Sequence, residues 1–411
     1  MTTMTTSGRI YFDYHATTPV DTRVAEVVNR FMLVEFGNAS SDHTYGDSAA
    51  EAVRVASNEV LALLGADEGK VVFTSGATES VNVALQSLAW ISASRTGIER
   101  IRIALTPIEH PAVLETCRSL AEDGQAELVF LNVDRRGQLD LYDVESCCES
   151  KVDVVCVMAA NNEIGTILPI QEVATIAHRH GALLLCDATQ AAGKIPVRAR
   201  EWGIDLLALS AHKMYGPKGV GALLTLSPVP LRRVIHGGHQ QGGLRAGTLN
   251  VPGIAGLGEA CRLRRLEMAG DETRVAQLRD NLERRLLNAI PSLVVNGDTN
   301  RRLAGNLHIS IPGVPNQAII ARVRRHLAIA TGSACQSGAE GPSHVLKAIN
   351  LADDLQAGAL RMGLGKYSTQ SEVDLAANLL ASAVQDARAA LEAGASDGFS
   401  ALPSGSSNSM S

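Results

Sequence analysis

Two short motifs carry the residue types that could do chemistry in this chain. Asp187 and Gln190 follow one apolar run, and Ser210, His212 and Lys213 follow the next. A lysine amine can form a Schiff base with an aldehyde, a carboxylate can keep a pyridine nitrogen protonated, and hydroxyl and imidazole donors can bind a phosphate. Together these residues predict a site for pyridoxal 5'-phosphate (PLP), and hence an enzyme.

A third segment, residues 71–80, predicts a phosphate-binding turn. It runs from an apolar strand through Gly76, Ala77 and Thr78 into a helical pattern. The start of a helix offers free backbone N–H groups and the positive end of the helix dipole, which suit a phosphate. Taken singly, Thr78 or Asp187 could be a helix cap and Lys213 a surface lysine. The three segments together favour the cofactor site.

The elements that must position these residues follow an α/β pattern. Short apolar runs at residues 71–73, 101–105, 128–131, 154–158, 183–186, 206–209 and 221–224 alternate with segments of helical period. Strands that are apolar on both faces and separated by helices predict a mostly parallel central sheet flanked by helices. Asp187 and Lys213 are then expected at the ends of successive strands.

The second half of the chain predicts a smaller α+β domain. A long charged helical segment is followed by the strand-like sequences NLHISI and AIATG and by two more helices. We predict a large PLP-binding domain over residues 19–258 and a small domain built from residues 1–18 and 259–394. Residues 395–411 are rich in Ser and Gly and are predicted to be a disordered tail.

Bulk composition excludes several classes of protein. The 411 residues exceed the roughly 250–300 at which single cores stop growing, which favours two domains. The formal charge of −6 and the 3% aromatic content disfavour direct nucleic-acid binding. No run approaches the roughly 18 apolar residues of a membrane helix, and the polar N-terminus lacks the apolar core of an export signal. We therefore predict no membrane association and a cytoplasmic location.

The cysteines give no sign of a disulfide framework or a metal site. The chain has seven, and no two form a C-x-x-C pair. Cys156 and Cys186 lie in apolar runs and are predicted to be core residues. The adjacent Cys147 and Cys148 lie in a polar segment, where a reduced pair on the surface is favoured over a redox pair. We predict no metal ligands.

The motifs of this chain resemble those of the cysteine desulfurases, in the aminotransferase class V branch of the fold-type I PLP enzymes. The matching sequences are FGNASSDH, TSGATES, EHPAV, NNEIG, DATQAAGK, SAHKMYGPKG, GGLRAGT and TGSACQSG. They lie between Tyr11 and Gly365, which is most of the chain. The last motif resembles the housekeeping-type, longer-loop group. The resemblance implies the fold-type I architecture, with the cysteine loop on the small domain.

The resemblance also implies which residues hold the cofactor. Lys213 would bind PLP covalently, Asp187 would pair with the pyridine nitrogen, and Gln190 would contact the ring hydroxyl. His110 would stack on the ring and serve in proton transfer. The phosphate would be held by Gly76, Ala77, Thr78, Ser210 and His212, together with Thr248 of the neighbouring subunit. The shared phosphate site implies a homodimer.

For the substrate, the resemblance implies L-cysteine and a reactive thiol at Cys335. Asn162 and Arg361 would bind the substrate carboxylate, the arginine through two parallel hydrogen bonds. Small neighbours at positions 330–338 favour an exposed, movable loop for Cys335 over a buried one. Its thiolate would take the sulfur as a persulfide, alanine would be released, and an acceptor protein would receive the sulfur.

Two other functions stay open from the sequence. The first is another class V reaction on the same fold, such as an aminotransferase or a selenocysteine lyase. The second is a non-catalytic scaffold partner in a sulfur-transfer complex. The destination of the sulfur is also open among iron–sulfur cluster assembly, tRNA thiolation, cofactor or natural-product thiolation and DNA phosphorothioation; we favour iron–sulfur assembly as the commonest use.

The sequence departs from the family pattern at two places. Residues 238–242, GHQQG, replace an expected glycine and acidic residue. Lys366 stands where arginine is common after the GLG sequence. The first change is expected to alter the wall of the site on the dimer side, and neither involves a residue assigned to chemistry.

Overall fold

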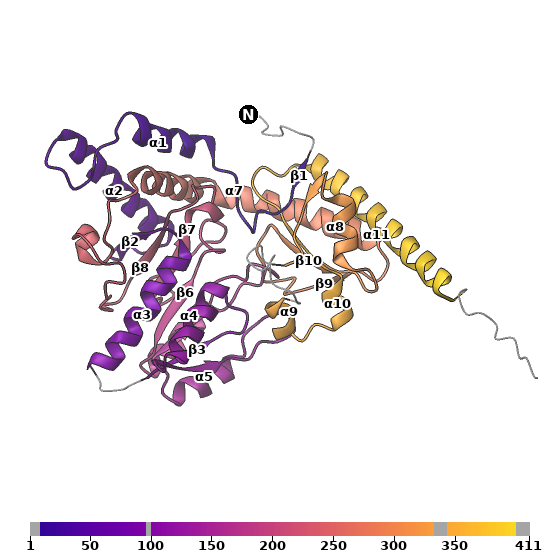
Figure 1. The fold of residues 1–411 in the computed structure, drawn as a ribbon, viewed down its shortest axis with the longest axis horizontal. Helices are drawn as coiled ribbons and strands as arrows, with labels where there is room; N and C mark the ends of the chain where they lie inside the picture. The colour runs from indigo at the N-terminus through magenta and orange to yellow at the C-terminus, as the bar shows by residue number, and fades with distance from the viewer. Residues whose placement is uncertain (1–8, 96–99, 333–342, 400–411) are drawn as a thin grey trace, which may run out of the picture.

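The chain folds around two main hydrophobic cores, a larger one at the central sheet and a smaller one at a second sheet. Figure 1 shows the elements around both. The structure is a computed structural model and describes residues 9–95, 100–332 and 343–399. The larger core lies on both faces of a seven-stranded sheet. The smaller core lies between a three-stranded sheet and the helices beside it. Within the described ranges, no helix is long and apolar enough to cross a membrane.

The central sheet is mostly parallel, as predicted. Its strand order is β2-β8-β7-β6-β5-β3-β4, and only β8 runs against its neighbours. The strands are β2 (Lys70–Thr74), β3 (Ile101–Leu105), β4 (Ala126–Phe130), β5 (Val154–Cys156), β6 (Leu183–Asp187), β7 (Leu206–Ser210) and β8 (Gly221–Thr225). Residues along β5, β6 and β7 are almost all buried, because helices cover both faces of the sheet.

Two sets of helices enclose this sheet. Helices α3 (Ala77–Arg95) and α4 (Pro111–Glu122) cover one face. The other face is covered by α2 (Thr44–Leu63), α5 (Leu141–Glu149), α6 (Ile170–Arg179) and the first half of α7 (Val251–Ala289). Helix α1 (Thr22–Leu33) lies outside them, against α7. This arrangement leaves the carboxyl ends of β5, β6 and β7 open at one edge, where α/β folds bind ligands.

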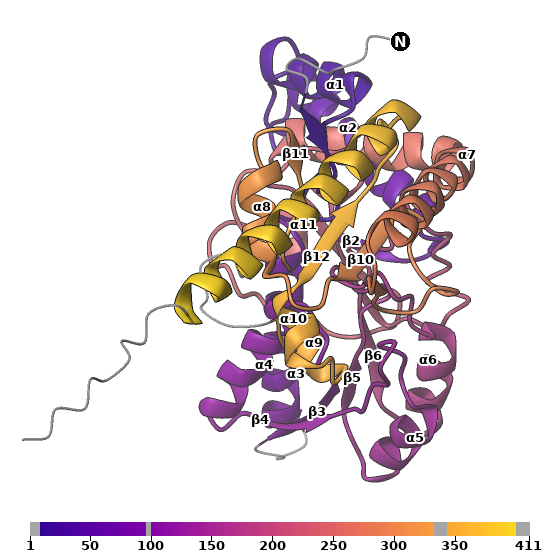
Figure 2. The same cartoon turned by 90° about the vertical axis from the view of Figure 1, so that its right-hand side faces the viewer.

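The smaller core packs two long helices against a short antiparallel sheet (Figure 2). The sheet order is β12 (Ala359–Gly363), β10 (Asn306–Ser310) and β9 (Val294–Val295). Strand β1 (Ile10–Tyr11) pairs in parallel with β11 (Leu327–Ala328). Later helices are α8 (Asn316–Val323), α9 (His344–Ala348), α10 (Asp353–Ala357) and α11 (Gln370–Phe399). Helices α8 and α11 pack in the smaller core, whereas Val345 and Leu346 of α9 pack in the larger one.

Helix α7 belongs to both cores. Ile254 and Leu257 pack in the large core, whereas Leu282 and Leu286 pack in the small one. The predicted domain boundary at residue 258 therefore falls inside a continuous helix. The N-terminal segment also joins the two parts, since β1 pairs with the small-domain strand β11 and the chain then runs to the pocket described below.

Several local predictions were wrong. The AIATG sequence forms a strand only at its start, in β11, and the sequence pattern did not reveal β12. Cys147 and Cys148 are buried, because α5 turns them toward the core beside α6. Helix α11 extends to Phe399, so residues 395–399 are helical rather than part of a disordered tail. Cys156 and Cys186 are core residues, as predicted.

Candidate active site

A pocket of about 420 Å³ lies at the carboxyl ends of the central strands. Its volume is within the roughly 300–1,000 Å³ of typical cofactor and small-molecule sites. Most of the residues predicted from the sequence meet in its wall, which includes Gly76, Ala77, Thr78, His110, Asn162, Asp187, Gln190, Ser210, His212, Lys213 and Arg361. Arg361 comes from the small-domain strand β12, so the pocket lies between the two cores.

Lys213 is the last residue of a short 3₁₀ turn, η1 (Ala211–Lys213), that follows β7. Two backbone carbonyls of the N-terminal segment hold its side chain. Its Nζ donates hydrogen bonds to the carbonyl oxygens of His15, at 2.7 Å, and Ala16, at 2.8 Å. Two residues later, Tyr215 has a φ of +67° and is buried, and its N–H donates to Thr18. This tightly packed turn fixes the point from which the lysine side chain extends into the pocket.

The DATQ motif turns directly after β6, as the sequence predicts. Asp187 is the last residue of that strand, and its Oδ1 accepts the backbone N–H of Thr189 at 2.9 Å. Gln190 is buried, and its Nε2 donates to the carbonyl oxygen of His15 at 2.9 Å. The carboxylate and the amide therefore lie in one wall of the pocket, next to the element that carries Lys213.

The phosphate-binding end of the pocket is built from two turns. Gly76, Ala77 and Thr78 form the start of the 19-residue helix α3, where backbone N–H groups lack partners within the helix. Ser210 and His212 line the same pocket from the end of β7. Burial and the nearby Lys213 and Lys218 lower the pKa of His212 to about 4, so its ring is neutral at physiological pH.

His110 begins helix α4 and lines the pocket. Its Nδ1 accepts the backbone N–H of Ala112 at 3.1 Å, which places the proton of the neutral ring on Nε2. Burial lowers its pKa, and the negative charge of Asp187 opposes that shift. A neutral ring in this tautomer is suited to stacking and to donating a hydrogen bond, and less suited to accepting a proton.

Arg361 is the most deeply buried cation of the pocket, with 1% of its surface exposed. Its Nη1 donates to the carbonyl oxygen of Asn162 at 3.0 Å, and its Nη2 pairs with the Asp13 carboxylate at 2.9 Å. Its Nε has no partner in the described part of the chain. A guanidinium held on two sides and with donors to spare is suited to binding a carboxylate.

The turn that carries Asn162 is the NNEIG motif. Asn161 accepts the N–H groups of Glu163 and Ile164, at 2.8 and 3.0 Å. Gly165 has a φ of +75°, and a β-carbon there would lie 2.3 Å from the side chain of Asn306. The motif is thus a close contact between the large domain and strand β10 of the small domain.

Cys335 lies outside the described residues, but the chain on either side of its segment is fixed close to the pocket. Ala330 pairs with Arg361 through two backbone hydrogen bonds, of 2.7 and 3.1 Å. On the other side, Ser343 caps helix α9 and donates a 2.6 Å hydrogen bond to the buried Glu163. The described chain on the two sides of the Cys335 segment is therefore fixed at Arg361 and at Glu163, the neighbour of Asn162 in the sequence.

Thr248 does not line this pocket, and its side chain is exposed. The loop before it is tied to the large domain by Arg245, which pairs with Glu79 of α3 at 2.9 Å. The departure at residues 238–242 has a structural role. Gln241 exchanges two hydrogen bonds, of 2.6 and 2.8 Å, with the backbone of Phe73 on the edge strand β2. Lys366 pairs with Asp21, away from the pocket.

Sequence reasoning missed three residues of the site. Asp13 and His15 come from the DYHATT sequence, and Lys194 ends the DATQAAGK motif. His15 is 2% exposed, and its Nε2 has no partner among the described residues. Lys194 donates to Gln190 at 2.8 Å. The spacing of four residues between Gln190 and Lys194 was a possible signal, but only the fold brings the N-terminal segment to them.

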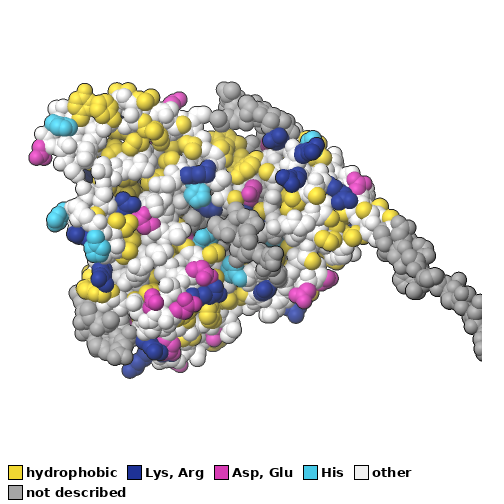
Figure 3. Space-filling model, viewed as in Figure 1, with side chains coloured by type: hydrophobic (Ala, Val, Ile, Leu, Met, Phe, Trp, Pro, Cys, Tyr) yellow, Lys and Arg dark blue, Asp and Glu magenta, His cyan; other side chains and the backbone are white. Residues whose placement is uncertain are grey.

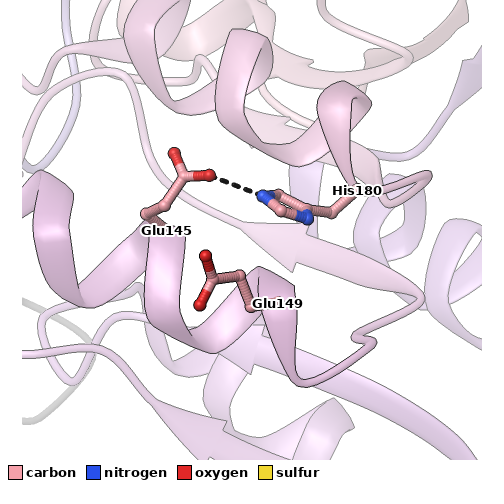
Figure 4. A group of neighbouring side chains, drawn as sticks. All are labelled: Glu145, Glu149 and His180. Atoms are coloured by element: carbon pink, nitrogen blue, oxygen red, sulfur yellow. Dashed lines mark hydrogen bonds and ion pairs between the residues drawn. The ribbon is translucent and has the colours of Figure 1, made fainter.

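A separate group of possible metal ligands lies on α5 and at the end of α6 (Figure 4). Glu145, Glu149 and His180 place their ligand atoms within 4.8 Å of one another. Glu145 already forms ion pairs with His180, at 2.6 Å, and Arg179, at 2.8 Å. These contacts account for the cluster as a set of surface ion pairs, and it is not part of the pocket.

Comparison with known proteins gives one consistent result. The aminotransferase class-V family matches residues 10–375. A cysteine desulfurase IscS of Anaeromyxobacter dehalogenans is 42% identical over 383 residues, which cover 92% of this chain and 93% of that protein. A solved NifS-like protein superposes with a TM-score of 0.83 at 34% identity, over 92% of this chain and 99% of that one. A structure described as SspA in complex with cysteine has a TM-score of 0.76 at 30% identity, over 88% and 100%.

The fold and the pocket define a class V enzyme of the PLP-dependent type, and the chain belongs to the aminotransferase class-V family. Within that family, it belongs to the cysteine desulfurases. The donor set of the pocket fits PLP, because it offers a lysine amine, a carboxylate and a helix start with nearby hydroxyl and imidazole groups.

Proposed function

We propose that this cysteine desulfurase binds PLP through Lys213 and converts L-cysteine to L-alanine, with the sulfur carried on Cys335. The observation that carries the proposal is the single pocket that joins Lys213 and Asp187 of the large domain to Arg361 of the small domain. When bound, PLP supplies an electron sink that labilises bonds at the substrate α-carbon. Asp187 would keep the pyridine nitrogen protonated, and the turn at residues 76–78 would hold the phosphate with Ser210.

The protein's own groups then orient the substrate and move its protons. Arg361, supported by Asn162, binds the α-carboxylate and fixes the position of the α-carbon. Lys213 extends from a rigid turn beside that position and accepts the α-proton. His110 would stack on the ring and would donate from Nε2, because its Nδ1 is used by the start of α4.

Cys335 decides the reaction. Its thiolate attacks the substrate sulfur, so that a sulfur–sulfur bond forms as the carbon–sulfur bond breaks, and a proton is added to the carbon to give alanine. The backbone pairing of Ala330 with Arg361 supports this role, because it anchors the segment before Cys335 at the substrate-binding arginine. The persulfide is then available to an acceptor protein, for which we favour iron–sulfur cluster assembly.

We also propose that the protein is a homodimer. Large apolar side chains are exposed at the end of α1 and the start of α2, where Figure 3 shows them gathered at the upper left. They are Met32, Leu33, Val34, Phe36 and Tyr45, each more than half exposed. Exposed apolar patches of this kind mark protein interfaces. In a dimer, Thr248 of the GGLRAGT motif, which does not line its own pocket, would be available to the pocket of the second copy.

The test is to incubate the purified protein with L-cysteine and a reductant and to measure alanine and sulfide. Lys213→Ala and Cys335→Ala are measured beside the wild type. We expect the wild type to form both products. Cys335→Ala should keep the visible absorbance of bound cofactor and form neither product, whereas Lys213→Ala should lose that absorbance band.

Other results would favour the alternatives. Turnover of cysteine by Cys335→Ala at the wild-type rate would exclude the persulfide route and favour a lyase. Formation of a 2-oxo acid in place of alanine would indicate an aminotransferase. Normal cofactor binding with no turnover, even when an acceptor protein is supplied, would indicate a non-catalytic scaffold partner.

A further inference from the structure

The hydrogen-bond partners around Gln190 fix the orientation of its side-chain amide. Its Nε2 donates to the carbonyl oxygen of His15 at 2.9 Å, and its Oε1 accepts from Lys194 at 2.8 Å. The ring Nδ1 of His15 is a third neighbour, 3.3 Å from the same Oε1. Gln190 is 4% exposed, so these contacts exclude water from most of the side chain.

The identity of the two ends of the amide follows from these partners. A backbone carbonyl only accepts, so a flipped amide would bring two oxygens to 2.9 Å at His15. The amine of Lys194 donates to Oε1 whether or not it is protonated. His15 must then donate from Nδ1, and its ring stays neutral because burial and the charges of Lys194 and Arg361 lower its pKa.

One hydrogen-bond donor of the Gln190 amide is then left for a ligand. The Oε1 uses both lone pairs on Lys194 and His15, and one N–H of Nε2 is used on the His15 carbonyl. The second N–H is the remaining one, and Gln190 lines the pocket. A ligand atom at this position must therefore accept a hydrogen bond, as an oxygen on the cofactor ring would.

Lys194 itself is fixed by a set of charges behind the pocket. The preceding residue, Gly193, accepts a 2.7 Å hydrogen bond from the buried Arg264 of α7. Arg264 also pairs with Asp271 and with Glu272, the latter at 2.9 Å. Burial, Lys213, Arg264 and Arg361 lower the pKa of Lys194, and Glu272 raises it. The amine lies among these charges, and its hydrogen-bond acceptor is the amide oxygen of Gln190, at 2.8 Å.

We propose that Lys194 is a positioning residue that, together with His15, orients the Gln190 amide so that its free N–H meets the ring oxygen of the cofactor. This inference rests on the proposed function. Without the Lys194 donor, Oε1 would lose its strongest partner, and the amide would be held less firmly with its free N–H toward the ring oxygen. A weaker hydrogen bond to the ring oxygen would destabilise its deprotonated form, so the pH midpoint of the cofactor's visible absorbance should rise.

The test is a double-mutant cycle in the full-length enzyme with cofactor. Lys194→Met, Gln190→Leu and the double variant are compared with the wild type, and Lys194→Arg serves as the conservative control that keeps a donor. The readouts are the pH midpoint of the absorbance band and the dissociation constant of PLP. We expect Lys194→Met to raise the midpoint and to weaken PLP binding about tenfold, the size of one lost hydrogen bond, and Lys194→Arg to restore at least part of both.

The cycle separates positioning from a simple effect of charge. If Lys194 acts through Gln190, then Lys194→Met has no further effect in the Gln190→Leu background. Additive effects of the two substitutions would overturn the proposal, because they would show that the charge of Lys194 acts on the cofactor directly. If the wild type turns over cysteine and the cycle is additive, only this inference fails. If the wild type binds no PLP, the proposed function fails with it.

Discussion

At the scale of single residues, the pocket depends on buried polar groups whose partners are almost fully accounted for. Arg361 uses two of its nitrogens on Asn162 and Asp13, and its buried Nε has no partner among the described residues. The Gln190 amide can form four hydrogen bonds, and three of them are made with His15 and Lys194. Such groups are fixed before the substrate arrives, which lowers the entropy cost of binding. The hydrogen-bond donors that remain unpaired therefore determine what a ligand in the pocket must accept.

A buried histidine in the small domain gives a prediction on pH. His308 lies in β10, is fully buried, and has an Nε2 without a partner in the described ranges. Burial lowers its pKa to about 3 from the ordinary 6.5. Below about pH 6.5, His308 is therefore protonated in the unfolded chain but not in the folded one. The free energy of unfolding decreases as the pH falls through this range.

We expect His308→Asn to weaken the pH dependence of unfolding. The wild type should lose about 1 kcal/mol more than the variant between about pH 7 and pH 5.5, as measured by urea unfolding of the cofactor-bound protein. His326→Asn, at an exposed histidine of the same domain, is the control and should behave as the wild type. Equal losses in the His308 variant and the wild type would contradict the assignment.

At the scale of elements, turns at the ends of strands bring the predicted residues together. The turn after β6 presents Asp187 and Gln190, the 3₁₀ turn after β7 presents Lys213, and the start of α3 presents Thr78. Each turn is short, so the side chains that it carries lie close to the end of the strand before it. The NNEIG turn differs, because it also forms the contact with the small domain.

Gly165 gives a prediction about that contact. Gly165→Ala combines a left-handed backbone with a β-carbon 2.3 Å from Asn306, and we expect a loss of about 3 kcal/mol in the free energy of unfolding. Gly124→Ala is the matched control, since Gly124 has a φ of +72° and nothing within 4 Å of the added carbon. It should cost only about 1 kcal/mol. Equal losses, measured by urea unfolding, would show that the contact with Asn306 adds nothing.

At the scale of the whole molecule, the active site lies between two cores that share α7 and the N-terminal segment. Arg361 is carried by one core and Lys213 by the other. In the N-terminal segment, Asp13 pairs with Arg361, and the carbonyl oxygen of His15 accepts a hydrogen bond from Lys213. The segment therefore contacts both cores. Relative movement of the two cores would therefore change the distance between Arg361 and Lys213, which makes the interface between the cores part of the pocket.

The homodimer is a prediction at the same scale. Leu33→Asp combined with Phe36→Asp places two charges in the exposed patch of α1, and we expect the mass in solution to fall from twice 43.3 kDa to 43.3 kDa. Leu391→Asp, at an exposed leucine of α11, should leave the mass unchanged. Sedimentation at several concentrations would measure this. A dimer that survives the double substitution would exclude the patch as the interface, and a wild type with the mass of one chain would exclude the homodimer.

Much of this protein could be predicted from its sequence. The alternation of apolar runs and helical segments gave the mostly parallel sheet, because strands buried on both faces need an unbroken apolar sequence. The chemistry-bearing motifs gave the pocket, because each follows a strand and the carboxyl ends of parallel strands meet at one edge. These are local rules, so a residue's neighbours in the sequence are enough to apply them.

Only the tertiary structure decided the contacts between distant segments. Nothing local to His15 or Lys194 shows that they meet Gln190, since the first contact spans 175 residues. The burial of Cys147 and Cys148 depends on the helix packed beside them, and the hidden strand β12 depends on its pairing with β10. Sequence patterns record what a segment prefers, whereas the partners of a buried polar group are fixed only when the chain has closed around it.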